Sequence, residues 1–473
     1  MIQSIRIPAA ELLDGLPDPW PENLQPRIEA AVRRSHRKVF VLDDDPTGTQ
    51  TVHGIPVLTH WSAAALAAEL QNDLPACYIL TNSRSLHLEA AQRINAEIGN
   101  RLQAAARETG RDIAVISRSD STLRGHFPGE VAALAAALEP SVDGWILCPF
   151  FEEGGRLTIG DVHYVREAQM LIPAGKTEFA SDAAFGYRAS NLRRWVEEKS
   201  AGRICSADIR SISIEDIRRG GPARIEAILT ELTGAAVCVV NAAGYRDLEV
   251  LVQGLLAAEA AGKSFVCRTA ASFVRVRAGL RPRSLLTAAD LTPASSGGGL
   301  TIVGSHVPKT TAQLQRLLSE RADTIALEVD VGRLLEEPTR SPVIETIAGR
   351  AEAALAQGRD VIIFTSRTYL ARPSAAAGLA AGRTISRGLV SILNRIRTRP
   401  RYILAKGGVT ASDIATKGLQ VRRAVVTGQI QPGVPVWEPG PESRFPKCPY
   451  VVFPGNVGDD RALLAAIEAL DRD

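Results

Sequence analysis

The chain has 473 residues, too many for a single hydrophobic core, so we expect two or more domains. A net charge of +3 lacks the basic excess of a nucleic-acid surface, and no apolar run reaches the roughly 18 residues that a membrane span needs, so we expect neither a nucleic-acid nor a membrane partner. The acids and prolines of residues 1–24 are unlike a signal peptide, which indicates a cytoplasmic protein.

Short β-branched runs alternate with Ala- and Leu-rich stretches in the first half of the chain. The runs predict strands at Lys38–Leu42, Ala76–Leu80, Asp112–Ile116, Gly144–Leu147 and Ala236–Val240. Helices are expected between them, at Ala63–Leu70, Ala90–Ala106 and Gly129–Leu138. This alternation is typical of βαβ units and a parallel sheet with helices on both faces. The segment Arg156–Ser206 is long, polar and poorly periodic, and we interpret it as an excursion that covers a site.

A second series of the same kind occupies the rest of the chain. It predicts strands at Leu300–Val303, Thr324–Glu328, Asp360–Phe364, Arg401–Leu404 and Tyr450–Phe453, and helices at Lys309–Ser319, Pro342–Gln357, Thr384–Arg397 and Thr410–Lys417. Arg268–Leu291 and the Gly/Ser-rich Thr292–Gly299 separate the two series and predict a linker. We therefore predict an α/β fold with two domains, 1–285 and 286–473, each with a mainly parallel sheet flanked by helices.

Three carboxylates follow the first predicted strand directly: Asp43, Asp44 and Asp45, with Thr47 and Gly48 close behind. Buried without partners, such neighbouring charges would cost several kcal/mol each. A fold accepts them only where cations, hydrogen-bond donors or a metal meet them. Ligands of α/β proteins bind at the carboxyl ends of strands, so this stretch favours an enzyme over a passive binding module.

Two further polar segments follow strands of the same series. Thr81–Ser85 contains Asn82 and Arg84, and Ser117–Glu130 contains Arg118, Asp120, Ser121, Thr122 and Arg124. Arginine guanidinium groups fit carboxylates and phosphates. An internal Asp–Arg ion pair in a polar turn is an equally good interpretation of the second segment alone. Taken together, the three strand ends indicate a cleft for a small, polar, anionic molecule.

In the second half of the chain, glycine-containing turns rather than charged clusters follow the predicted strands. Gly304-Ser305, Lys406-Gly407-Gly408 and Gly455-Asn456 each follow a predicted strand. Backbone N–H groups at such turns suit phosphate oxygens, and Lys406 could supply a point charge. Ordinary turn chemistry is the better explanation of any single turn, and the P-loop and Rossmann motifs are absent from the sequence. A small acid in one domain and a phosphate-bearing ligand in the other fit phosphoryl transfer, which needs positioning, magnesium and neutralising cations.

These motifs resemble those of the four-carbon acid sugar kinases. Asp44–Gly48 (DDPTG) resembles the family's D-D-x-T-G motif, and Asp120–Gly125 (DSTLRG) its D-S-T-L-R-G motif. Phe151–Arg156 resembles the segment that ends in G-R-T-T, while Lys406–Thr410 and Pro454–Asn456 resemble the nucleotide-side motifs. The similarity spans almost the whole chain in the family's order.

The resemblance implies a kinase that phosphorylates the terminal hydroxyl of threonate, erythronate or 3-oxo-tetronate with ATP and Mg²⁺, with the acid in the N-terminal and ATP in the C-terminal domain. The implied nucleotide contacts are Ser305, Lys406, Gly407, Gly408, Val409, Thr410, Gly455 and Asn456. The expected catalytic residues are Asp45, Asp120 and Arg124, and the expected substrate contacts are Asp44, Thr47, Arg84 and Ser121. We favour Asp45 as the base, with Asp120 as the alternative, and Arg84 and Arg124 as the carboxylate receptors.

Two other classes of protein stay open. Asp43-x-Asp45-x-Thr47 also fits the D-x-D-x-T pattern of haloacid-dehalogenase-like phosphatases, in which the first aspartate attacks phosphorus. A non-catalytic sugar-acid sensor would bind the acid without needing ATP. The six cysteines lack C-x-x-C spacing and the seven histidines lack H-x-x-x-H and H-E-x-x-H, so we assign no residue as a metal ligand. The sequence gives no oligomeric state, and we allow for a homodimer.

Overall fold

The computed structural model describes residues 5–291, 297–367 and 375–471. The chain divides into two compact units: the first holds the residues up to Ile55 and His60–Pro282, and the second holds Pro56–Thr59 and the residues from Arg283 onward. The division at Pro282 lies beside the expected boundary near residue 285. The transfer of Pro56–Thr59 to the second unit was not predicted. Part of the expected linker, residues 292–296, lies outside the described residues.

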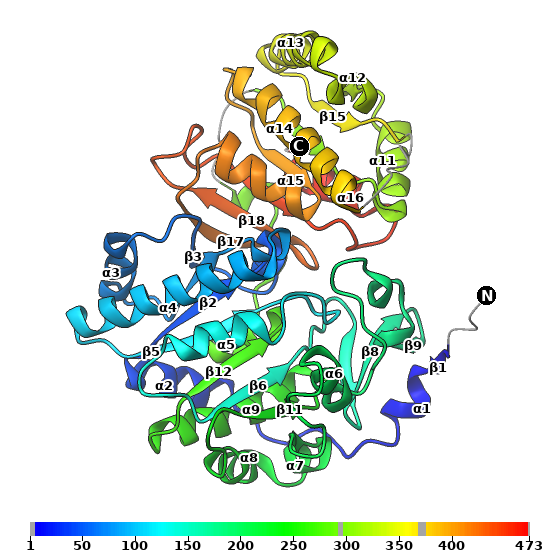
Figure 1. Ribbon diagram of the computed structural model, residues 1–473. Coiled ribbons are helices and arrows are strands. Elements are labelled where there is room, and N and C mark those ends of the chain that lie inside the picture. The colour runs from blue at the N-terminus through cyan, green and yellow to red at the C-terminus, as the bar shows by residue number, and fades with distance from the viewer. Residues whose placement is uncertain (1–4, 292–296, 368–374, 472–473) are drawn as a thin grey trace. The chain divides into compact units, whose positions relative to one another are not determined.

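The first unit contains a parallel sheet with helices in two groups (Figure 1). Its strand order is β10 (Arg210–Ile212), β11 (Ala236–Val240), β6 (Gly144–Cys148), β12 (Phe265–Thr269), β5 (Ile113–Arg118), β2 (Lys38–Asp43) and β4 (Ala76–Leu80). Its helices include α2 (Gln25–Ser35), α3 (Ala63–Gln71), α4 (Leu88–Thr109), α5 (Gly129–Ala136), α8 (Gly221–Thr230) and α9 (Tyr245–Ala260). Every residue of β2 is buried, as expected for a parallel strand covered on both faces.

Strand β12 corrects the sequence analysis, which ended the first series at Val240 and assigned Arg268 to the linker. The structure places Phe265–Thr269 in the middle of the sheet, where it pairs in parallel with both β5 and β6. All five residues of this strand are buried, Arg268 and Thr269 as well as the apolar run Phe265-Val266-Cys267. Helix α10 (Ala271–Arg277) follows it, so the connection between the units begins only after Arg277.

The predicted excursion supplies three of the four strands of a second, antiparallel sheet, and the fourth comes from the N-terminal segment. Its order is β1 (Ile7–Pro8), β9 (Met170–Pro173), β8 (Val162–Glu167) and β7 (Arg156–Ile159), and helix α6 (Leu192–Lys199) follows it. Strands β7 and β8 are joined by Gly160-Asp161, which both have positive φ, 57° and 63°. Two such residues form the tight turn that suits the twist of a β-hairpin.

The second unit also has a mainly parallel sheet. Its order is β17 (Arg423–Gln431), β18 (Val434–Pro439), β19 (Tyr450–Phe453), β16 (Ile403–Lys406), β13 (Leu300–Val303), β15 (Val361–Thr365) and β14 (Ile325–Val329). The strands from β19 to β14 are parallel, whereas β17 and β18 form an antiparallel hairpin that was not predicted. Its helices are α11 (Pro308–Glu320), α12 (Val331–Leu335), α13 (Glu337–Ala356), α14 (Ala375–Arg395), α15 (Gly408–Asp413) and α16 (Ala462–Leu470). The predicted fold class is confirmed in both units.

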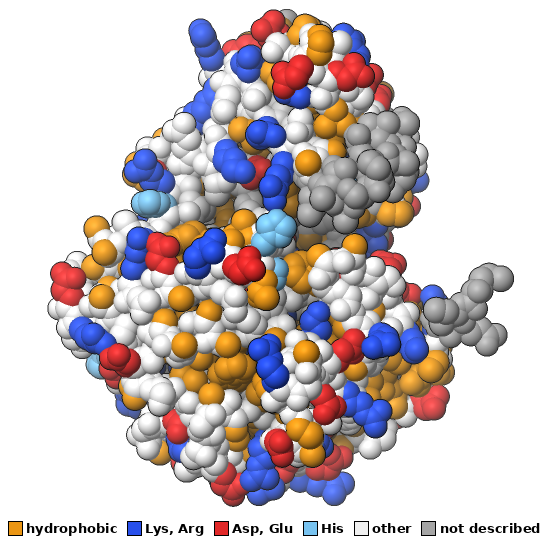
Figure 2. Space-filling view, in the orientation of Figure 1, with side chains coloured by type: hydrophobic (Ala, Val, Ile, Leu, Met, Phe, Trp, Pro, Cys, Tyr) orange, Lys and Arg blue, Asp and Glu red, His pale blue; other side chains and the backbone are white. Residues whose placement is uncertain are grey.

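The helices and the surface charge of the structure bear on two expectations drawn from the composition. Among the described residues, no helix has the length and apolar character of a membrane span. On the face of the molecule drawn in Figure 2, basic and acidic side chains are interspersed. This mixture agrees with the small net charge of the sequence.

Candidate active site

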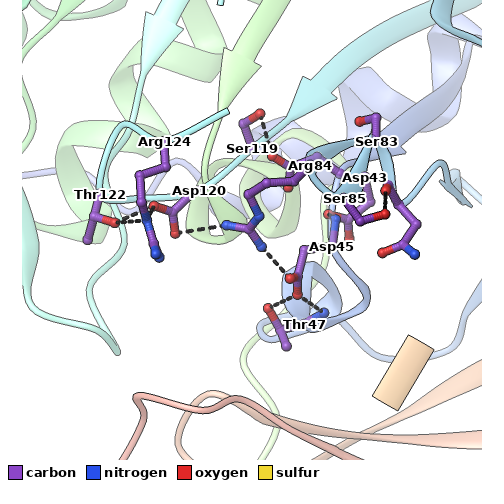
Figure 3. A network of polar contacts seen from close by, with 12 residues as sticks. Asp43, Asp45, Thr47, Ser83, Arg84, Ser85, Ser119, Asp120, Thr122 and Arg124 are labelled. Atoms are coloured by element: carbon purple, nitrogen blue, oxygen red, sulfur yellow. Dashed lines mark hydrogen bonds and ion pairs between the residues drawn. The ribbon is translucent and has the colours of Figure 1, made fainter. Parts of the chain in front are cut away.

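The first-unit site lies where three neighbouring parallel strands end. Strand β2 pairs with β4 and β5, with Asp43 opposite Leu80 on one side and Arg118 on the other. The segments that follow these strands therefore meet at one edge of the sheet, as Figure 3 shows. The structure thus brings together the three polar clusters that the sequence indicated.

Asp43 and Asp44 are buried beneath this edge. Nη1 of Arg118 lies 2.9 Å from Oδ1 of Asp43 and 3.7 Å from Oδ1 of Asp44, while the Ser119 hydroxyl donates to Oδ2 of Asp44 at 3.0 Å. Burial raises the pKa of Asp43 to about 7, although Arg118 opposes the shift. An added Cβ at Gly48 would overlap the Asp43 carboxylate, so this turn requires glycine. Asp43 and Asp44 are thus buried below the partly exposed side chains of the site.

Asp45 and Asp120 lie above them and share one arginine. Arg84 forms ion pairs with both, and the pair with Asp120 measures 3.3 Å. Asp45 also caps the short 3₁₀ helix Pro46–Thr49, because Oδ1 accepts the Thr47 N–H at 2.9 Å and the Thr47 hydroxyl at 2.6 Å. Burial alone would raise the pKa of Asp45, but Arg84 and Thr47 outweigh it and lower the pKa. Asp45 is therefore ionised and held in one orientation.

Asp120 is neutralised more completely. Its Oδ2 accepts from Nε of Arg124 at 2.8 Å and from the Thr122 hydroxyl, while Oδ1 faces Arg84. Burial raises the pKa of Asp120, but Arg124 and Arg84 outweigh it and hold the pKa well below its ordinary value. Arg124 also lies 3.6 Å from Asp182. The side chains of Asp45 and Asp120 are 15% and 13% exposed, so both carboxylates can be reached by a ligand.

The excursion holds the DSTLRG loop from one side. The Tyr187 hydroxyl donates to the Thr122 carbonyl at 2.6 Å, and Nε2 of His163 lies 2.8 Å from the Ser121 carbonyl. Burial lowers the pKa of His163 to about 4, so the ring is neutral, donates from Nε2 to this carbonyl, and accepts at Nδ1 from Thr158. Leu123 has a φ of 69°, which residues other than glycine rarely adopt, and the bonds to the neighbouring carbonyls hold that backbone conformation. For Ser121, contact with substrate stays a prediction.

The second unit gathers predicted nucleotide residues around Ser305. The φ of Gly407 is 112°, and a Cβ there would lie 2.8 Å from Cβ of Ser305. A Cβ at Gly455 would lie 3.1 Å from the Ser305 hydroxyl, and that hydroxyl accepts from Thr310 at 3.2 Å. The side chain of Thr410 packs against Gly304 at the start of the same turn. Gly407 and Gly455 thus let their turns approach Ser305 closely, where a side chain would not fit.

The other predicted nucleotide residues differ in position. Lys406 is fully buried: Nζ donates to the Pro454 carbonyl at 2.7 Å and lies 4.0 Å from the ring centre of Phe453. Burial lowers its pKa well below the ordinary value. Lys406 thus holds the Pro454 turn, and its contact with phosphate stays a prediction. Gly408 begins α15, Val409 is 52% exposed, and Asn456 is partly buried beside Gly455.

Sequence reasoning missed two arginines. Arg367 follows β15 and donates to the carbonyls of Ser305 at 2.6 Å and Thr365 at 3.0 Å. The sequence feature that could have revealed Arg367 is the polar pair Ser366-Arg367, which comes soon after the predicted strand Asp360–Phe364. Arg268, at the end of β12, donates to the Arg124 carbonyl at 3.1 Å, and it was missed because its strand was assigned to the linker.

The comparisons identify the family. Residues 39–277 match the domain family described as "Sugar-binding N-terminal domain", and residues 300–463 match the "Nucleotide-binding C-terminal domain". The chain belongs to the four-carbon acid sugar kinase family. This result confirms the resemblance.

Individual relatives extend over almost the whole chain. A D-threonate kinase from Cupriavidus necator is 25% identical over 456 residues, which cover 91% of this chain and 97% of that kinase. A Salmonella typhimurium LT2 protein described as a tRNA synthase has a TM-score of 0.66 at 18% identity, over 92% of this chain and 100% of its own. A Haemophilus influenzae protein has a TM-score of 0.61 at 18% identity, over 91% and 100%. At such identity the two structures show the shared fold alone.

Proposed function

We propose that this protein is an ATP-dependent kinase that phosphorylates the terminal hydroxyl of a four-carbon sugar acid of the threonate, erythronate or 3-oxo-tetronate type. The family and the D-threonate kinase relative support phosphotransferase activity. The observation that carries the proposal is the pair of ionised aspartates, Asp45 and Asp120, joined by Arg84 in the sugar-binding domain. A hydroxyl beside such a carboxylate is oriented, and its proton has an acceptor, when it attacks phosphorus.

Asp45 is the better base of the two. Asp120 is paired with two arginines and bonded to Thr122, whereas Asp45 is paired with Arg84 alone and bonded to neutral donors of Thr47. Each cation stabilises the ionised form of its carboxylate and makes it a weaker proton acceptor. Asp120 accordingly orients Arg84 and Arg124, and Asp45 accepts the proton.

The nucleotide belongs to the second unit in this proposal. The glycine turns beside Ser305 are the proposed phosphate site, and the guanidinium of Arg367, which donates to the Ser305 carbonyl, would offset the phosphate charge. Mg²⁺ in such sites is usually held by phosphates, waters and one or two carboxylates, so it needs no dedicated protein cage. When bound with ATP, it neutralises charge on the transferred group.

The alternative classes of protein fit less well. A haloacid-dehalogenase-like phosphatase would need Asp43 to attack phosphorus, but Asp43 is 1% exposed and lies against Gly48. A sensor would have no use for the glycine turns of the second unit. A homodimer and a cytoplasmic location stay predictions.

The test is an ADP-release assay with ATP, Mg²⁺ and five acids: D- and L-threonate, D- and L-erythronate, and 3-oxo-tetronate. ADP formation that depends on one acid supports the kinase and names its substrate. Silence on all five with tight ADP binding would redirect the search to other small hydroxy acids. Hydrolysis of a generic phosphate ester without nucleotide would favour the phosphatase, and acid binding with no ATP requirement would favour the sensor.

A further inference from the structure

Most arginines of the first-unit site are already paired with aspartates. Arg84, Arg118 and Arg124 all form such ion pairs. Within the described ranges, Arg156 and Arg268 have none. Arg268 is fully buried between two aromatic rings, whereas Arg156 is only partly buried, and its Nε is enclosed without a hydrogen-bond partner. Of these five site arginines in the described residues, Arg156 is thus the one that has no ion pair and is not fully buried.

Arg156 borders the network of Asp120 and Arg124. The guanidinium carbons of Arg124 and Arg156 lie 5.2 and 5.7 Å from the centre of the same ring, Phe179. Burial lowers the pKa of Arg156, with Asp120 opposing the shift and Arg124 adding to it. An arginine stays charged under these conditions, so the site holds a desolvated positive charge that an anionic ligand would stabilise.

The backbone that carries Arg156 is fixed by hydrogen bonds within the protein. Phe151 and Arg156 exchange two backbone hydrogen bonds, of 3.0 and 2.8 Å. The N–H of Glu152 donates to the Ser272 hydroxyl at 3.2 Å, which fixes the turn to α10. A Cβ at Gly154 would lie 3.0 Å from Nη1 of Arg156, so glycine leaves the room that the guanidinium occupies. Such preorganisation lowers the entropy cost of binding.

We infer that Arg156 binds the carboxylate of the sugar acid, an inference that rests on the proposed function. Arg156 and Arg124 contact the same ring, Phe179, and Arg124 is paired with Asp120. Arg84 then joins Asp120 to Asp45, as Figure 3 shows. The acid lies along this series with its carboxylate at Arg156 and its terminal hydroxyl at Asp45. On this inference Arg84 and Arg124, which the sequence suggested as carboxylate receptors, keep their ion pairs with Asp45 and Asp120.

The test compares Arg156→Gln with Arg166→Gln. Arg166 is an exposed arginine on the neighbouring strand β8, close to Gly155, and serves as the matched control. Isothermal titration with D-threonate, and with the other four acids in parallel, measures binding without turnover. We expect Arg156→Gln to weaken binding of the accepted acid about 10- to 100-fold, because a charge-assisted bidentate pair is lost, and Arg166→Gln to leave it unchanged. Arg156→Lys, which keeps the charge without the fork, should fall between, and it serves if the glutamine variant does not fold.

A neutral acceptor separates binding of the carboxylate from a structural role. With ATP and D-threitol, which lacks the carboxylate, kcat/KM should be the same for Arg156→Gln and the wild type. An equal loss on threitol and on the acid would overturn the inference, as would a higher KM for ATP with unchanged acid binding. Acid binding that depends on Arg156 without turnover would uphold the inference while refuting the kinase. Turnover with an unchanged acid KM in Arg156→Gln would uphold the kinase and refute the inference. A wild type that binds none of the five acids would overturn both the inference and the proposed four-carbon acid substrate.

Discussion

The replacement Asp45→Asn removes the proposed base while preserving its surroundings. The amide oxygen can still accept from the N–H and hydroxyl of Thr47, and Arg84 keeps Asp120 at 3.3 Å. The stability loss should therefore stay at about 1 to 3 kcal/mol, the cost of one charge-assisted hydrogen bond. The rate should fall by about two to four orders of magnitude, which raises the barrier by about 3 to 5 kcal/mol. Single-turnover kinetics of ADP formation at saturating acid isolate this step.

Asp182→Asn is the matched control for this prediction. It removes a carboxylate 3.6 Å from Arg124 in the same site, and the asparagine can still accept from the N–H groups of Ala184 and Phe185. We expect less than a tenfold loss of rate for this variant. A rate within threefold of the wild type for Asp45→Asn would refute the assignment. A larger loss for Asp120→Asn, at an unchanged KM for acid, would transfer the role of base to Asp120.

Three further predictions concern stability and nucleotide binding. Gly48→Ala should destabilise by about 1 to 3 kcal/mol or more in urea unfolding, because the added methyl overlaps Asp43, whereas Gly349→Ala, in open space on α13, should not. Burial lowers the pKa of His163 to about 4, whereas an unfolded histidine titrates near 6.5, so the contribution of His163 to the free energy of unfolding should fall by up to about 3 kcal/mol as pH drops from about 6.5 to about 4. Asp43, whose pKa is raised to about 7, contributes with the opposite sign over this range. The difference in free energy of unfolding between the wild type and His163→Asn cancels the contribution of Asp43 and should shrink by that amount; a difference that does not change with pH would contradict the burial argument. Lys406→Met should lower stability by about 1 to 3 kcal/mol with less than about a tenfold rise in the KM for ATP, whereas a hundredfold rise at unchanged stability would make Lys406 a phosphate ligand.

The parallel strands were predictable because their sequences satisfy one strong condition. A strand covered on both faces must be apolar along its length, and Lys38–Leu42 and Leu300–Val303 have that pattern before a polar or glycine turn. The β17–β18 hairpin was missed because its outer residues are polar. In β17 buried and half-buried residues alternate, a pattern of antiparallel strands that a search for strand–helix repeats passes over.

The sequence predicted which residues lie at the site, but not which arginine forms an ion pair with which aspartate. The motifs brought Asp45, Arg84, Asp120 and Arg124 to one sheet edge, because parallel strands end together. Which arginine meets which carboxylate depends on side-chain directions that sequence spacing does not fix. Which of Arg84, Arg124 and Arg156 meets the substrate carboxylate could be weighed only from the ion pairs that the structure gives to each of them.

The most direct test of the central claim is the ³¹P NMR spectrum of the product that wild-type enzyme forms from ATP, Mg²⁺ and the accepted acid. Phosphorylation of the terminal hydroxyl places phosphorus beside a CH₂ group, so the proton-coupled signal should be a triplet, with one equivalent of ADP formed. A doublet would place the phosphate on a secondary hydroxyl and contradict the orientation from Arg156 to Asp45. Inorganic phosphate as the only new signal would contradict the kinase itself.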